Sequence, residues 1–136
     1  MISDLYRHRR AFWTHVAEHA PELHARSAYA TEHSRWIVVG PLPLVVALFV
    51  ANGSAGIFVR GARGVRTAVI RELLFPNREL LARALGKPDI RLGTYFPLAS
   101  SVRADMTDET NWPRAVRWFV ENAPLYERAM ADLQRR

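Results

Sequence analysis

The sequence predicts a single α+β domain over residues 1–136, with an N-terminal helix, antiparallel strands, two short helices, a weak strand pair and a long kinked C-terminal helix. Three observations predict this fold class. Apolar residues recur at the helical period near both ends of the chain, and runs of β-branched and aromatic residues fill the region from 36 to 59. The length of 136 residues suits one domain with a core of its own.

The first expected element is an amphipathic helix over about residues 4–19. Phe12, Val16 and Ala20 fall on one side of it at about 100° per residue. Because Pro21 cannot continue a helix, we expect the helix to end there and a polar connection to follow.

Residues 36–39 and 44–50 are apolar runs rich in valine and aromatic residues, which is typical of buried strands. Gly40 and Pro41 break the two runs from each other. Asn52-Gly53 is the preferred pair with positive φ for a two-residue hairpin, so a third strand is expected over residues 56–59.

Helical periodicity returns at Thr67 and is interrupted at Phe75-Pro76. Asn77 is then expected to cap a second short helix, which Gly86 ends. The apolar residues expected inside these two helices are Ile70, Leu73, Leu74, Leu80, Leu81, Ala84 and Leu85.

Residues 90–96 and 101–106 are weaker strand candidates, expected to pair antiparallel with each other. The last helix is expected to begin at Asn111-Trp112-Pro113, because a cap residue, an N1 proline and preceding acids favour a helix start. Pro124 is expected to kink this helix. Its expected buried residues are Val116, Phe119, Val120, Ala123, Tyr126, Met130 and Leu133.

The net charge of +6 is concentrated in the middle of the chain. Residues 36–91 contain seven Arg and Lys87 against three acidic residues, and so supply +5. Such a patch is either a solvated basic face or a site for a polyanion, and the two interpretations stay open. Phe49 and Phe58 in the same region offer stacking platforms for bases, although their apolar strands favour the core.

The segment from residue 60 to residue 66 places three arginines and two glycines between the third strand and the next helix. Unpaired N–H groups at a helix start and neighbouring guanidinium groups bind phosphate. The candidate anion-binding residues are therefore Arg60, Arg63, Arg66, Arg71 and Arg78. The alternative is a glycine-permitted turn with solvent-exposed arginines. The glycines match neither a Walker A loop nor a dinucleotide fingerprint, so no nucleotide cofactor is expected.

The sequence His15-Val-Ala-Glu18-His19 matches the His-x-x-Glu-His arrangement of inverted zinc peptidases. Such a site needs a third ligand, and a cluster of ordinary histidines with His8 on the same face is the alternative. We expect neither a metal nor another cofactor. If a metal did bind, its candidate ligands would be His15, Glu18 and His19.

Other catalytic arrangements are weaker. The chain has no cysteine and no Gly-x-Ser-x-Gly motif, so thiolate and common serine nucleophiles are not expected. Asp105, Asp108 and Glu109 have the chemistry to bind Mg²⁺ or transfer a proton, but acids before a helix also stabilise its N-terminus, and we prefer that role. The sequence leaves an enzyme open but favours a non-catalytic module.

Four short patterns follow one another along the chain: Arg10-Ala-Phe-Trp13, Leu80-Leu81 before Leu85-Gly86, Asn111-Trp-Pro113, and Arg117-Trp118. In this order they resemble an uncharacterised bacterial domain family of about this length, commonly found C-terminal to a restriction-endonuclease-like nuclease region. The resemblance implies an α+β module with antiparallel strands and an association with nucleic-acid processing or defence, and it transfers no active site. We expect a stand-alone domain here, with any nuclease as a separate partner.

The leading functional expectation is a non-catalytic accessory module that contacts nucleic-acid phosphate backbone, or a nucleic-acid-processing partner, through the basic strand-to-helix region. The alternative is a protein-interaction or homo-oligomerisation module without nucleic-acid binding. The third is a small metal-dependent hydrolase through His15, Glu18 and His19. We expect no membrane partner and a cytoplasmic location, because no apolar block of signal-peptide or membrane-spanning type is present.

Overall fold

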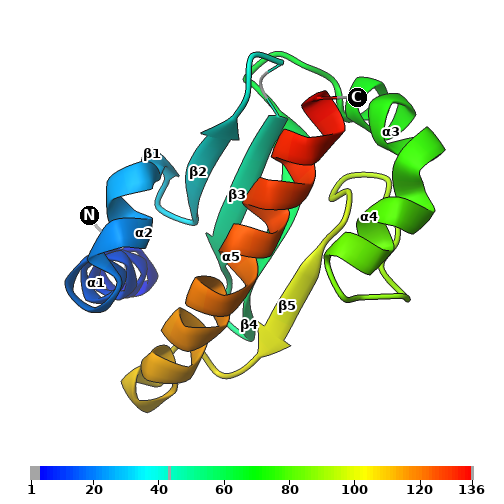
Figure 1. Ribbon diagram of the computed structural model, residues 1–136. Helices are drawn as coiled ribbons and strands as arrows, with labels where there is room; N and C mark the ends of the chain where they lie inside the picture. Colours follow the sequence, from blue (N-terminus) through cyan, green and yellow to red (C-terminus); the bar gives the residue numbers. More distant parts are fainter. Residues whose placement is uncertain (1–3, 43, 136) are drawn as a thin grey trace.

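The computed structural model describes residues 4–42 and 44–135, with side chains from residue 7 onward. It confirms the α+β class, because a five-stranded antiparallel sheet lies against a layer of helices (Figure 1). In chain order the elements are α1 (Asp4–His19), α2 (Pro21–Arg26), β1 (Ala28–Thr31), β2 (Ser34–Val39), β3 (Leu44–Val50), β4 (Ser54–Gly61), α3 (Thr67–Leu74), η1 (Phe75–Asn77), α4 (Arg78–Ala84), β5 (Ser100–Arg103), η2 (Glu109–Asn111) and α5 (Trp112–Gln134).

The strands of the sheet follow chain order, β1-β2-β3-β4-β5, and each neighbouring pair is antiparallel. In the centre, Val46 of β3 lies between Ile37 of β2 and Val59 of β4. Because side chains alternate along a strand, these three point to one face, and the next residue, Ala47, points to the other.

The hydrophobic core lies between the sheet and α5, which runs diagonally across β2, β3 and β4 (Figure 1). Phe119, Tyr126 and Met130 of α5 are fully buried there. Val120 was expected with them but is 48% exposed, because it follows Phe119 directly and so points away from the sheet. The helix continues through Pro124, which has no N–H to donate. Among the helices of the described residues, none is long and apolar enough to cross a membrane.

The helix α1 packs beside the first half of α5. The rings of Phe12 and Trp13 lie 6.2 Å and 6.0 Å from the ring of Phe119. The helix ends at His19 as predicted, but α2 and β1 then occupy the segment where a polar connection was expected. Pro21 stands in the first turn of α2, where a missing N–H costs nothing, so one proline ends one helix and begins the next.

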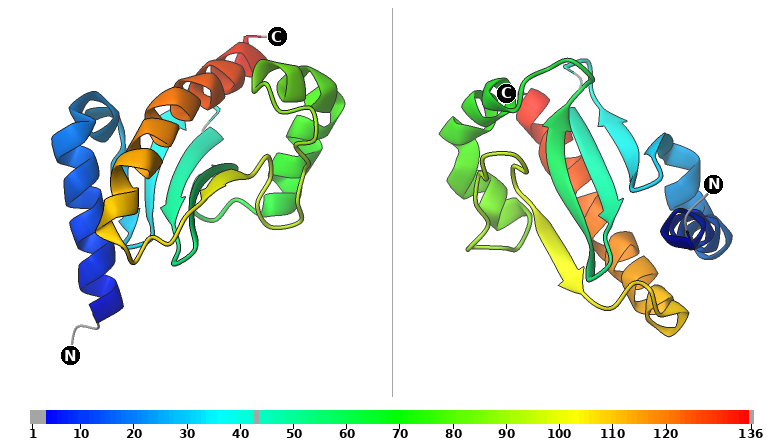
Figure 2. Two further views of the ribbon diagram at one scale, coloured as in Figure 1. Left: turned by 90° about the horizontal axis from the view of Figure 1, so that it is seen from below. Right: turned by 180° about the vertical axis from the view of Figure 1, so that it is seen from behind.

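The helices α3 and α4 lie beside the C-terminal half of α5 (Figures 1 and 2). Ile70, Leu74 and Leu81 are buried as predicted, whereas Leu73 is 38% exposed. The side chain of Asn77 makes no capping hydrogen bond, because η1 carries the chain from α3 into α4 almost without a break.

The predicted pairing of residues 90–96 with residues 101–106 is wrong. β5 pairs with β4, and residues 90–96 form a loop with an isolated bridge between Leu92 and Pro97. The outer edge of β4 presents backbone groups that need partners. The strand β5 supplies them, and the carbonyl of Pro97 accepts a hydrogen bond from the N–H of Val59 at 2.8 Å.

The hairpin between β3 and β4 forms at Asn52-Gly53, as predicted. Val50 lies opposite Ala55, and the N–H of Ala51 donates to the carbonyl of Ser54 at 2.8 Å. Neither Asn52 nor Gly53 adopts the left-handed backbone, so the predicted turn type is wrong although its place is right.

Candidate functional site

One face of the sheet carries no helix within the described part of the chain. The right-hand view of Figure 2 shows the strands in front of α5, with no helix over their centre. The residues of β2 to β5 that point to this face are Ser34, Trp36, Val38, Val45, Ala47, Phe49, Ser54, Gly56, Phe58, Arg60, Ser101 and Arg103. We call this set the open sheet face. Val45 and Ala47 are buried but lie outside the helix-side core, so larger neighbours on the same face cover them.

Arg60 and Arg63 meet over the ring of Trp36 on the open sheet face. Their guanidinium carbons lie 4.2 Å and 4.8 Å from the ring centroid. Arg60 Nε also donates to the carbonyl of Gly61 at 3.0 Å, and Arg63 Nη2 donates to the carbonyl of Ala30 at 3.1 Å. Cation–π contacts such as those of Arg60 and Arg63 with Trp36 contribute about 0.5–1 kcal/mol each at exposed sites. The structure therefore brings two of the five predicted arginines onto one indole.

The two guanidinium groups repel each other. Burial, and then the charge of Arg63, lowers the pKa of Arg60, although arginine stays protonated at neutral pH. The ion pairs among the described residues involve neither Arg60 nor Arg63. The five strands contain no Asp or Glu at all. An anion bound between the two groups would relieve the repulsion.

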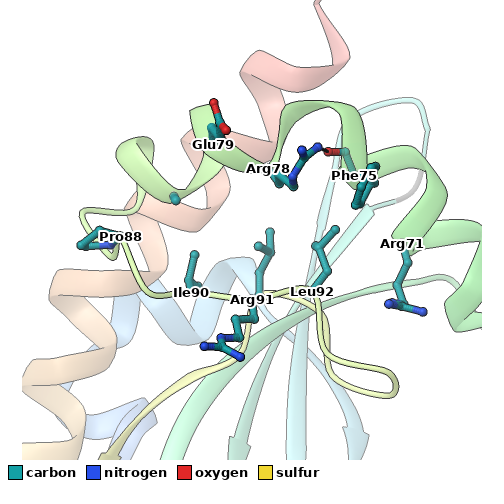
Figure 3. A pocket seen from close by; sticks show the side chains of 10 residues that line it. Arg71, Phe75, Arg78, Glu79, Pro88, Ile90, Arg91 and Leu92 are labelled. Carbon is teal, nitrogen blue, oxygen red and sulfur yellow. Dashed lines mark hydrogen bonds between the residues drawn. The ribbon is translucent and has the colours of Figure 1, made fainter.

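The other predicted arginines lie away from Trp36. Arg66 directly precedes α3 and is exposed, and its side chain makes no capping bond. Arg71 and Arg78 line a separate pocket between α3, α4 and the loop that precedes β5 (Figure 3). The five predicted arginines thus divide into a pair over Trp36, a pair at this pocket, and Arg66, which belongs to neither.

The pocket has a volume of about 380 Å³ and combines apolar walls with charged residues. Its lining includes Phe75, Pro88, Ile90, Leu92 and Leu98 besides Arg71, Arg78, Arg91 and Glu79. Figure 3 shows the guanidinium groups of Arg71 and Arg91 on the side away from Glu79. Arg78 is held in place, because Nη1 donates to the carbonyl of Phe75 at 2.9 Å and the group lies over the ring of Phe75. The pocket is a second position suited to an anionic group.

Phe49 and Phe58 belong to the open sheet face and not to the helix-side core where they were expected. The rings of Phe49 and Phe58 are 6.0 Å apart, and Phe96 from the loop before β5 stands edge-on to Phe58 at 5.1 Å. Phe96 is 58% exposed. The ring of Phe49 lies over Gly56, where a Cβ atom would come within 2.5 Å of Cζ. These three aromatic side chains form a cluster on the same face as the arginine pair.

The His15, Glu18 and His19 motif does not come together with a third ligand. The rings of His15 and His19 stack at 4.0 Å, and Nδ1 of His19 is 3.0 Å from the carbonyl of His15. Burial, and then His19, lowers the pKa of His15. The described residues contain no group of three or more His, Asp or Glu that could hold a metal ion. His8 and His15 both lie against the ring of Trp112, as in a cluster of ordinary histidines.

The acidic residues before α5 are engaged in turns. A carboxylate oxygen of Asp108 accepts hydrogen bonds from the N–H and hydroxyl of Thr110, which lowers the pKa of Asp108. Asp105 accepts in the same way from Thr107. Asn111, predicted as the cap of α5, instead donates from its side chain to the carbonyl of Asp105. These bonds fit the capping role and assemble no catalytic carboxylate pair.

Trp36, Phe96 and Arg91 belong to the two sites but were not predicted as site residues. The position of Trp36 could have been predicted from the sequence, because side chains alternate along a strand and Trp36 is two residues from Val38, on the same face of β2. The contact of Phe96 with Phe58 depends on a loop whose path no local pattern specifies.

No family model, no curated protein and no solved structure matches this chain.

Proposed function

We propose that this protein is a non-catalytic module that binds nucleic acid through the phosphate backbone. The observation that carries the proposal is the arginine pair, Arg60 and Arg63, held side by side over Trp36 on the open sheet face without a described carboxylate partner. Guanidinium groups bind phosphate oxygens through paired, charge-assisted hydrogen bonds.

The distribution of the other cations favours a polymer over a single small anion. Arg103 lies on the open sheet face, and Arg91 belongs to the loop that carries Phe96. Residues 36–91 supply +5 of the net charge of +6. Spread cations meet the repeated phosphates of a nucleic acid at several points, and each contact releases counterions.

The test is a salt titration of nucleic-acid binding by the wild type and by the double variant Arg60→Ala, Arg63→Ala. Fluorescence anisotropy with a labelled oligonucleotide measures affinity from about 50 to 200 mM salt. We expect weaker binding at every salt concentration and a slope of log K against log salt that is smaller by about 1.4–1.8, because two phosphate contacts are lost.

The matched control is Arg114→Ala with Arg128→Ala, which removes two exposed arginines of α5 on the other side of the molecule. This control has the same net charge as the test variant and should keep most of the slope. Equal losses in both double variants would mean that net charge, and not the arginine pair, controls binding. No binding by the wild type at low salt would contradict the proposal.

An exposed apolar row on α3 favours the second candidate, self-association without nucleic-acid binding. Val69 and Leu73 are 46% and 38% exposed and lie four residues apart on α3, so they share one side of the helix. Val65, just before α3, is also 38% exposed. Light scattering discriminates between the candidates. A stable dimer that binds no oligonucleotide would favour self-association over the proposed function.

A further inference from the structure

We infer that the nucleic acid is single-stranded and that its bases stack on the aromatic cluster of Phe49, Phe58 and Phe96. The inference rests on the proposed function and names the form of nucleic acid bound by the same face. It starts from the exposure of Phe96, which stands edge-on to Phe58 with 58% of its surface open to solvent. Exposed rings on a sheet are surfaces on which unpaired bases stack, whatever their sequence.

The arginine pair and the aromatic cluster lie within reach of one strand. Phe58 and Arg60 are two residues apart on β4, so they share a face at a separation of about 7 Å along the strand. A nucleotide whose phosphate meets Arg60 therefore has its base, or that of its neighbour, close to Phe58. Trp36 is a positioning residue here, because the guanidinium groups of Arg60 and Arg63 already cover its ring.

The width of the face argues against a duplex as the preferred ligand. Five strands spaced by about 4.8 Å span roughly 19 Å, whereas the major groove is about 12 Å wide and the minor groove about 6 Å. The sheet cannot enter either groove, and the bases of a duplex are stacked on each other and unavailable to Phe96. A single strand lies across the face with bases free to turn toward it.

The composition of the face also favours nucleic acid over an apolar protein partner. The open sheet face carries Arg60 and Arg103, and none of the five strands contains an acidic residue. An apolar partner would have to cover the guanidinium groups of Arg60 and Arg63 without supplying counter-charge, which is costly. A polyanion with aromatic bases matches both the charge and the rings.

The experiment compares labelled single strands of 12 nucleotides, one DNA and one RNA, with the DNA duplex of the same sequence. We expect the single strands to bind at least about tenfold more tightly than the duplex. Phe96→Leu should weaken single-strand binding by about fivefold to 100-fold, because a stacking surface for a base is lost. The dependence of affinity on salt should stay the same, because no phosphate contact is lost. Comparing the DNA strand with the RNA strand shows which of the two kinds of single-stranded nucleic acid the protein prefers.

The matched control is Tyr29→Leu, which changes an exposed aromatic residue (67%) on the edge strand β1 whose ring lies under Arg35, away from the aromatic cluster. This variant should bind single strands with little change. Equal affinity for duplex and single strand, with no effect of Phe96→Leu, would overturn the inference and leave the proposed function standing. Absence of binding to both forms at low salt would remove the proposed function as well.

Discussion

At the scale of single residues, Tyr126 joins the core to the segment that precedes β5. Its hydroxyl donates to the carbonyl of Leu98 and forms a hydrogen bond of 2.7 Å with the hydroxyl of Ser100. Burial raises the pKa of Tyr126 to about 12. Leu98 has a positive φ of 56°, which a leucine adopts only when the surrounding structure holds it. The tyrosine is one of the groups that holds it.

Replacing Tyr126 with Phe should lower the free energy of unfolding by about 1–3 kcal/mol, because the buried carbonyl of Leu98 loses its partner. Urea unfolding followed by circular dichroism measures this change. Ser100→Ala is the control and should cost less, because the bond between Tyr126 and Leu98 remains. A loss of equal size in the two variants would contradict the role given to Leu98.

His15 should make stability depend on pH in the weakly acidic range. Its pKa in the folded protein is lowered from 6.5, so the unfolded chain binds the proton more readily. The stability due to neutral His15 is complete above about pH 6.5 and is lost as the pH falls toward the lower folded pKa. Glu18 and Glu109 oppose this effect but do not reverse it.

The corresponding measurement is the melting temperature of the wild type and of His15→Gln from about pH 5 to pH 8. The variant has no proton to bind at this position, so the gap between the two proteins should narrow as the pH falls. His24→Gln, at an exposed position of α2, is the control and should follow the wild type. A gap that stays constant across this range would contradict the assignment.

At the scale of elements, the contact between β4 and β5 depends on the absence of a side chain at Gly56. A Cβ atom there would lie 2.5 Å from both the Phe49 ring and the backbone carbonyl oxygen of Ser100. Gly56→Ala should therefore separate β5 from β4, displace Phe49 and destabilise the protein by about 1–3 kcal/mol. Gly53→Ala is the matched control, because nothing lies within 4 Å of its Cβ position. Equal unfolding midpoints for both variants would contradict this account.

Elements set by local pattern were predicted well. α1, β3, the turn at Asn52-Gly53 and the helix that begins at Thr67 lie where periodicity, glycine and proline place them. β5 was assigned the wrong partner, because its pairing is decided by the free edge of β4, far away in the sequence. α2 was missed because the proline that ends one helix also suits the first turn of the next.

The candidate site was predicted only in part, because local sequence patterns can be read from the sequence and contacts between distant segments cannot. The glycine and arginine segment from residue 60 to residue 66 is a local feature, and it identified Arg60 and Arg63. Their meeting over Trp36 depends on strand register, which the sequence pattern did not supply. Apolarity alone placed Phe49 in the core, since a strand pattern does not say which face a helix covers.

At the scale of the whole molecule, all the long packed helices lie on one side of the sheet and leave the other side to aromatic residues and arginines (Figure 2). A five-stranded sheet with β-branched residues on both faces would ordinarily be covered twice or remain polar on one side. Here Val45 and Ala47 are buried beneath larger side chains of the open sheet face, so this face is well packed without helices covering it.

The order of the strands also bears on how the chain folds. β1 to β4 are joined by short turns, so their pairings need little loop closure, whereas β5 joins β4 only after α3, α4 and a long loop have intervened. Non-local pairings of this kind form late and slowly. We therefore expect the β1–β4 meander to form first and β5 to pair with β4 last. Substitutions at the β4–β5 contact should then raise the unfolding rate more than they lower the folding rate. The loop that carries Phe96 should be the last part of the proposed binding surface to assemble.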